Sequence, residues 1–172
     1  AHSAQAAGHN RADVQAKPAT PSLAARSRVG RRAVDPRARG FLAMMQGRRI
    51  VITGGGGFIG VSLAKRLADT NDVVLCDLEF TRNAYAYASL DGHPNVQRVE
   101  ADILDGDALK RVCSGAAIVI HLAAVVGVQQ VLMNTSRTLE VNIRGTQHAL
   151  EAVVAKDVER FVYLSTSEVY DA

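Results

Sequence analysis

A run of glycines between residues 53 and 60 is the part of the sequence whose spacing most clearly indicates chemistry. The run, Thr-Gly-Gly-Gly-Gly-Phe-Ile-Gly, joins a short β-branched segment, 49–53, to a segment with helical spacing, 58–68. Glycines in such a turn let the backbone bend sharply and approach a pyrophosphate, and the helix that follows offers free N–H groups to the phosphates. Gly54, Gly57 and Gly60 have the spacing for these roles, so the loop predicts a dinucleotide-binding site.

An acidic residue lies where the next apolar segment ends. Asp77 closes the segment 72–77, 17 residues after Gly60. A carboxylate in this place accepts hydrogen bonds from the ribose hydroxyls of a bound dinucleotide, and it repels a 2′-phosphate. The sequence therefore favours NAD over NADP, although Arg82, close by in the sequence, would weaken that preference.

Alternating strand-like and helix-like segments must position these residues. The apolar strands are continuous rather than alternating, which is typical of a parallel sheet covered on both faces. We expect an α/β fold of the Rossmann type, a doubly wound parallel sheet of about five strands that is truncated at its C-terminal side. The predicted strands are 49–53, 72–77, 96–99, 117–122 and 160–164, the predicted helices are 58–68, 105–113 and 135–155, and 81–91 is ambiguous. Ile59, Leu63 and Leu67 are expected to share one face of the first helix, and Leu139, Ile143, Leu150 and Val154 are expected to point inward on the longest.

The first 43 residues differ in composition from the rest of the chain. They hold eight basic and two acidic residues, a net charge of +6, whereas residues 44–172 hold twelve basic and fifteen acidic residues, a net charge of −3. Because 1–43 is poor in large apolar residues, we expect a disordered leader, either a transit peptide or upstream sequence, followed by one domain over 44–172. The folded part has no basic cluster and no long apolar stretch, so we expect neither nucleic-acid binding nor a membrane span.

The two cysteines are far apart in the sequence and belong to no Cys/His cluster. Cys76 and Cys113 both lie in apolar segments. This placement predicts buried free thiols in a reducing compartment, which here means the cytoplasm, and it predicts no metal site.

The motifs together resemble those of a known family, the extended short-chain dehydrogenase/reductases, which includes NAD-dependent epimerases, dehydratases and decarboxylases of nucleotide sugars. The resemblance runs from about Arg48 to Tyr170. It matches residues 53–60 to the family's TGxxGFIG loop, Asp77 to its ribose-binding acid, and 121–124 to an HxAA motif beside the nicotinamide. It also matches Asn142 to a largely architectural asparagine. The cofactor-binding set that this resemblance implies is Gly54, Gly57, Phe58, Ile59, Gly60, Asp77, Asp102, Ile103, Leu122, Ala123, Ala124 and Ser165.

The segment after the last predicted strand resembles the loop that carries the family's catalytic hydroxyl. By that resemblance Thr166 would hydrogen-bond the sugar oxygen that is oxidised, and Ser167 and Glu168 would complete the catalytic set. Dehydratases of the family usually have an Asp-Glu pair where this chain has Ser167-Glu168. The string from Ser165 to Tyr170 is more similar to UDP-glucuronate decarboxylases and related epimerases. Judged without the family, Thr166 would be a hydroxyl that bonds local backbone.

The family's base, a Tyr-x-x-x-Lys motif, does not occur in these 172 residues. We therefore interpret the chain as the N-terminal part of an NAD-dependent enzyme that acts on a nucleotide sugar by transient oxidation at C4, as an isomerase or lyase. The chain alone is expected to be inactive, and the full-length protein to be a homodimer. Two alternatives stay open: a non-catalytic NAD-binding module and a reductase of a non-sugar carbonyl.

Overall fold

Five parallel strands form the centre of the molecule in the computed structural model, which describes residues 45–80, 90–166 and 170. The strands are β1 (Arg49–Thr53), β2 (Asp72–Asp77), β3 (Val96–Glu100), β4 (Ile118–His121) and β5 (Arg160–Tyr163). Their order in the sheet is β3-β2-β1-β4-β5. The helical segments are α2 (Phe58–Leu67), α4 (Gly106–Val112), α5 (Val128–Met133), α6 (Thr135–Leu139), the π-helical segment η2 (Glu140–Gly145) and α7 (Thr146–Ala155).

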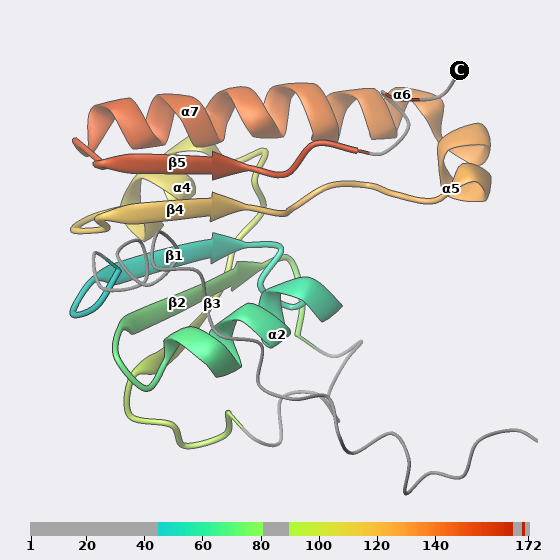
Figure 1. Ribbon diagram of the computed structural model, residues 1–172. Helices are drawn as coiled ribbons and strands as arrows, with labels where there is room; N and C mark the ends of the chain where they lie inside the picture. Colours follow the sequence, from blue (N-terminus) through green and yellow to red (C-terminus); the bar gives the residue numbers. More distant parts are fainter. Residues whose placement is uncertain (1–44, 81–89, 167–169, 171–172) are drawn as a thin grey trace, which may run out of the picture. The chain divides into compact units, whose positions relative to one another are not determined.

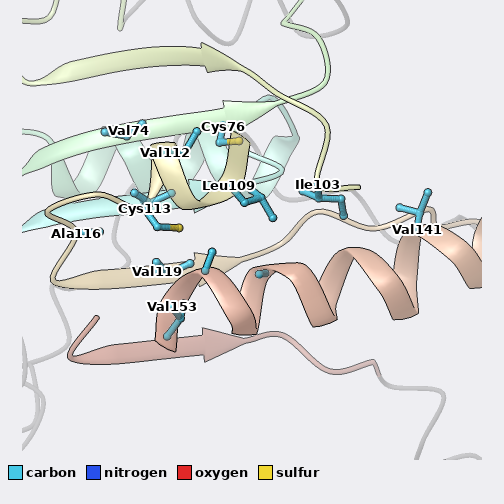
Figure 2. Packing of buried hydrophobic residues seen from close by; sticks show 13 residues of the cluster. Val74, Cys76, Ile103, Leu109, Val112, Cys113, Ala116, Val119, Val141 and Val153 are labelled. Carbon is cyan, nitrogen blue, oxygen red and sulfur yellow. The ribbon is translucent and has the colours of Figure 1, made fainter. Parts of the chain in front are cut away.

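Apolar side chains cover both faces of the sheet, because successive residues of a strand point to opposite sides. Along β2, Val73 and Leu75 pack with residues of α2, whereas Val74 and Cys76 pack with residues of α4 and α7. Figure 1 shows the helices on the two sides of the sheet, and Figure 2 shows the cluster between the sheet, α4 and α7. The predicted doubly wound parallel sheet of the Rossmann type is confirmed.

The strand order reverses between β1 and β4, which both lie at the centre of the sheet. In such a sheet the crevice at the carboxyl ends of the strands, where the order reverses, is the place where ligands bind. Thr53 and His121, the last residues of β1 and β4, are register partners at this edge. The fold therefore brings the glycine loop after Thr53 beside the segment after His121.

The prediction for the inward face of the longest helix was wrong. The structure has one nearly continuous helical stretch over 135–155, as expected, but Leu139, Ile143, Leu150 and Val154 are 45–77% exposed. The buried residues of this stretch are Thr138, Val141, Gly145, Ala149, Ala152 and Val153. Both faces carry apolar residues, and the face with glycine and alanine allows the closer approach to α4. The π-helical segment, whose wider turn shifts the phase of the helix, was not predicted either.

The first helix shows a smaller shift of the same kind. Its buried residues are Gly60, Val61 and Ala64, whereas Ile59 is 51% exposed and Leu63 and Leu67 are only partly buried. The predicted leader, 1–43, lies outside the described residues, as does most of the ambiguous segment 81–91.

In the described part of the chain, no helix is long and apolar enough to cross a membrane. The same residues contain no group of three or more His, Cys, Asp or Glu side chains that could hold a metal ion.

Candidate functional site

The glycine loop bends directly after β1 and packs against the segment that follows β4. Gly54 has a positive φ of 68°, and a Cβ atom built on it would lie 2.7 Å from the backbone nitrogen of Ala123. At the other end of the loop, a Cβ on Gly60 would lie 2.7 Å from the carbonyl oxygen of Gly54. Only glycine satisfies both the backbone conformation and the close approach at Gly54, and only glycine lets α2 begin so near the turn.

The first turn of α2 is open to an anion. Gly57 occupies the N-cap position and supplies no capping side chain, and its own N–H donates to the Gly54 carbonyl over 3.0 Å. The N–H groups of Phe58, Ile59 and Gly60 have no acceptor within the helix, because an α-helix leaves its first N–H groups unpaired. Phe58 and Ile59 are exposed beside them. A pyrophosphate fits this helix end, which presents N–H donors and a positive dipole.

Asp77 lies at the end of β2 and holds the glycine loop in place. Its Oδ2 accepts from the N–H of Gly56 over 2.7 Å, and its Oδ1 accepts from the N–H of Leu78 over 2.8 Å. A Cβ on Gly56 would lie 2.7 Å from the same Oδ2. Sequence reasoning missed this requirement for Gly56, which is a variable position in the motif. A carboxylate has about four acceptor positions, so Asp77 can still accept from ribose hydroxyls.

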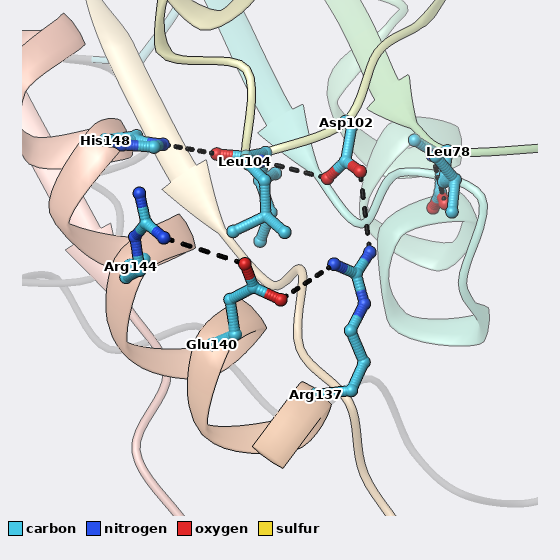
Figure 3. Close-up of polar contacts among 9 residues, drawn as sticks. Leu78, Asp102, Leu104, Arg137, Glu140, Arg144 and His148 are labelled. Carbon is cyan, nitrogen blue, oxygen red and sulfur yellow. Dashed lines mark hydrogen bonds and ion pairs between the residues drawn. The ribbon is translucent and has the colours of Figure 1, made fainter. Parts of the chain in front are cut away.

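The segment after β3 is tied to the helical stretch that contains α6 and η2. Asp102 Oδ1 accepts from the N–H of Leu104 over 2.9 Å, and Oδ2 lies 3.6 Å from Arg137 Nη2. Arg137 also pairs with Glu140, and Glu140 with Arg144, over 3.2 and 3.7 Å (Figure 3). These groups are substantially exposed, so each pair stabilises the fold by at most about 1 kcal/mol. They orient the Asp102 carboxylate at the edge where the adenine is expected.

Ile103, the neighbour of Asp102, lies mostly inside the core. Its side chain is 7% exposed, and a Cβ on Gly145 would lie 2.4 Å from Ile103 Cδ1. Its carbonyl oxygen lies 3.2 Å from Nδ1 of His148 (Figure 3). The structure therefore places Ile103 as a packing residue between the segment after β3 and η2.

The segment after β4 is held in place by its backbone. Leu122 donates its N–H to the Thr53 carbonyl over 3.0 Å, and the N–H of Ala123 lies 3.4 Å from Thr53 Oγ1. Asn142 clamps Val125 through both of its amide atoms, since Oδ1 accepts from the Val125 N–H over 2.8 Å and Nδ2 donates to the Val125 carbonyl over 3.0 Å. Leu122 and Ala123 are partly buried and Ala124 is exposed. Asn142 thus has the architectural contacts that were expected of it.

Ser165 and Thr166 follow β5 and are both exposed at the same edge of the sheet as Gly54 and Ala123. Ser167 and Glu168 lie outside the described residues. The structure therefore brings the loop, Asp77, Asp102, the segment 122–124 and Thr166 to one edge. It leaves the predicted pair Ser167 and Glu168 without a described position.

This sheet, with a glycine-rich turn after the first strand and an acid after the second, defines a dinucleotide-binding domain of the extended short-chain dehydrogenase/reductase class. Residues 51–171 match the 3-beta hydroxysteroid dehydrogenase/isomerase family, and the chain belongs to that family.

Proteins similar to this chain have known descriptions and structures. The low-salt glycan biosynthesis protein Agl12 of Haloferax volcanii is 32% identical over 124 residues, which are 70% of this chain and 40% of that protein. The epimerase Mth375 of Methanothermobacter thermautotrophicus is 32% identical, with a TM-score of 0.66 over 72% of this chain and 37% of the epimerase. The dTDP-glucose 4,6-dehydratase DesIV of Streptomyces venezuelae, solved with NAD bound, is 34% identical, with a TM-score of 0.66 over 72% of this chain and 41% of DesIV. The chain thus spans about two fifths of the length of these relatives.

Proposed function

We propose that this chain is the NAD-binding part of an enzyme that acts on a nucleotide sugar. The observation that carries the proposal is the cradle at the carboxyl edge of the sheet. There the open N-terminus of α2 lies beyond a loop that only glycines can form, and Asp77 lies beside it. The solved relatives with NAD bound, DesIV among them, support the choice of cofactor.

The proposed reaction begins with transient oxidation of the sugar at C4. When bound, NAD supplies a hydride acceptor. In this proposal the first N–H groups of α2 hold the pyrophosphate, Asp77 accepts from a ribose hydroxyl, and Asp102 lies beside the adenine. Thr166 hydrogen-bonds the sugar oxygen and helps to pass its proton, and Ser167 and Glu168, which follow it in the sequence, complete the catalytic set.

The outcome after oxidation is proposed to be 4-epimerisation or decarboxylation of a UDP-sugar. Ser167 stands where dehydratases of the family usually carry an aspartate, and elimination of water needs an acid and a base. Among the structural relatives are an epimerase and a UDP-N-acetylglucosamine 4-epimerase, the latter 26% identical with a TM-score of 0.67. A dehydratase is also among these relatives. The preference for epimerisation or decarboxylation therefore rests on the residue at position 167.

A non-sugar substrate is the second candidate. The family description names a hydroxysteroid dehydrogenase, which acts on an alcohol that is not a sugar. A non-catalytic NAD-binding module is a third interpretation. The coding sequence downstream of residue 172 separates the module from both enzymes, because a Tyr-x-x-x-Lys codon run supports an enzyme and a stop codon supports the module.

The full-length protein is proposed to be a homodimer in the cytoplasm. The exposed residues Leu139, Ile143, Leu150 and Val154 form an apolar stripe along the helical stretch 135–155, and stripes of this kind mark association surfaces. Cys76 and Cys113 are buried free thiols, and burial raises their pKa values to about 12 and about 11. Unpaired cysteines of this kind are typical of a reducing compartment.

Titration of the chain with NAD and NADP tests the proposed cofactor site. We expect the wild-type chain to prefer NAD. Asp77→Asn should weaken NAD binding by about tenfold and narrow the preference over NADP, since it removes the charge that repels a 2′-phosphate. Asp69→Asn, which removes an exposed carboxylate next to His93, is the matched control and should change neither affinity. Equal NAD and NADP affinities in the wild type would contradict the role of Asp77.

A further inference from the structure

His121 is buried at the carboxyl end of β4, where the sequence resemblance had suggested a residue lining the nicotinamide. Its side chain is 2% exposed. The imidazole stacks on Phe161 and Tyr163 of β5, with ring centroids 5.9 and 6.1 Å apart. Because the ring is enclosed in this way, it can influence the surface of the site only through the residues that it contacts.

Both ring nitrogens of His121 have a threonine hydroxyl as partner. Nδ1 lies 2.7 Å from Thr53 Oγ1, and Nε2 lies 3.2 Å from Thr146 Oγ1. Burial lowers the pKa of His121 from 6.5 to about 4, so the ring is neutral at pH 7 and carries one hydrogen. One threonine must therefore donate to the ring and the other must accept from it.

The neighbouring hydrogen bonds decide which nitrogen carries that hydrogen. Thr146 donates its single hydroxyl hydrogen to the carbonyl oxygen of Asn142 over 2.7 Å, so its oxygen accepts from Nε2–H. Thr53 then donates to Nδ1, and its oxygen is left to accept from the N–H of Ala123. All the hydrogen bonds then run in one direction, from Ala123 through Thr53, His121 and Thr146 to Asn142.

The hydrogen-bond chain joins three segments that surround the cradle. Thr53 is the residue before Gly54, so it sets where the glycine loop begins. Ala123 belongs to the segment against which Gly54 packs. Asn142, in η2, clamps Val125 of that same segment through both amide atoms.

We propose that His121 is a positioning residue, which as the Nε2–H tautomer fixes the glycine loop, the segment after β4 and the π-helical segment in one register and so sets the geometry of the NAD cradle. The effect on NAD rests on the cofactor site proposed above, whereas the hydrogen-bond chain itself does not.

Nitrogen-15 NMR of the histidine rings in the cofactor-free chain tests the hydrogen-bond chain on its own. We expect His121 to be neutral at pH 7, with hydrogen on Nε2 and none on Nδ1. The Thr146→Val variant removes the acceptor, so the tautomer preference of His121 should weaken. A His121 ring that carries its hydrogen on Nδ1 in the wild type would overturn the proposal, independently of the NAD affinity of the chain.

NAD affinity tests the positioning role, and two threonines of the same helical stretch provide a matched pair. Thr146 and Thr138 both donate to the carbonyl oxygen four residues earlier, over 2.7 and 3.0 Å, but only Thr146 contacts His121. Thr146→Val should weaken NAD binding by about three- to tenfold, and Thr138→Val should leave it unchanged.

Thr146→Ser, which restores the hydroxyl, should recover NAD affinity. Equal NAD affinity in the wild type, Thr146→Val and Thr138→Val would overturn the positioning role. A wild-type chain that does not bind NAD would instead contradict the proposed function, and the NMR result would still decide the hydrogen-bond chain. If Thr146→Val does not fold, the wild-type tautomer decides the hydrogen-bond chain, and Thr53→Val, which removes the partner of Nδ1, takes its place in the NAD titration with the same expected loss.

Discussion

At the scale of single residues, the cradle depends on positions where a side chain has no room. Gly54 combines a left-handed backbone conformation with direct packing on the Ala123 backbone, and Gly56 faces the Asp77 carboxylate. The motif identifies Gly54, but the need for Gly56, which lies in the turn after β1, follows from Asp77 at the end of β2 and from the Glu79 carbonyl beside it. Residues that are far apart in the sequence therefore decide which glycines of the loop are required.

Gly54→Ala tests this crowding. The added Cβ would meet the positive φ of 68° and a backbone atom at 2.7 Å, so we expect a loss of about 3 kcal/mol in the free energy of unfolding. Gly92 has a similar φ of 72° with no atom within 4 Å of the added Cβ. Gly92→Ala should therefore cost only about 1 kcal/mol. Urea unfolding of both variants measures the difference, and equal losses would show that crowding at Gly54 is unimportant.

His121 also gives the fold a pH dependence. Its pKa is about 4 in the folded chain and 6.5 in the ordinary case, because burial disfavours the charged ring. Between these values the unfolded chain binds one more proton, so stability falls as the pH drops from 6.5 toward 4, by about 1.4 kcal/mol per unit. Urea unfolding between pH 4.5 and 7.5 should show this slope. In His121→Phe the contribution of His121 to this slope should disappear. Identical slopes in the wild type and in His121→Phe would contradict the assignment of the slope to His121.

At the scale of elements, the helical stretch 135–155 has two apolar faces. Gly145, Ala149 and Ala152 pack inward, while the stripe of Leu139, Ile143, Leu150 and Val154 is exposed. Bulky apolar residues recur at helical spacing on the outer face, which is why the sequence pattern indicated the wrong side. Small residues occupy the inner face because they allow α7 to lie close to α4, and residues of both helices belong to one core cluster.

Charged residues in the stripe test its role in association. We expect the double variant Ile143→Lys with Val154→Lys to shift the chain toward the monomer in sedimentation velocity, with little change in stability, because both side chains are exposed. Leu132→Lys, at an equally exposed residue of α5 outside the stripe, is the control and should leave association unchanged. A wild-type chain that stays monomeric at all concentrations would contradict the proposal.

At the scale of the whole molecule, these 172 residues contain the loop and the acid that we propose to hold the cofactor, but no Tyr-x-x-x-Lys motif. The described residues bring the cradle and Thr166 to one edge of the sheet. Binding and turnover are therefore expected to separate in this chain.

Turnover assays check that separation. With NAD and UDP-glucose, UDP-N-acetylglucosamine or UDP-glucuronate, we expect the purified chain to form no epimer and to release no carbon dioxide, because the Tyr-x-x-x-Lys motif whose tyrosine takes the hydroxyl proton in the family does not occur in these 172 residues. Calorimetry on the same sample should still detect NAD binding, which serves as the control for folded protein. Measurable turnover would overturn the claim that the chain is inactive by itself.

The sequence by itself determined the parallel sheet and the tight glycine turn after β1, because both depend on local patterns. Continuous apolar strands, the glycine spacing and an acid at a strand end each occupy a few neighbouring residues. Tertiary structure alone decided the inner face of the helix over 135–155, the burial of His121 between two threonines, and the second use of Asp77 as an anchor for Gly56. These features depend on which distant segments meet, and close packing between them depends on shape that a pattern of apolar residues does not encode.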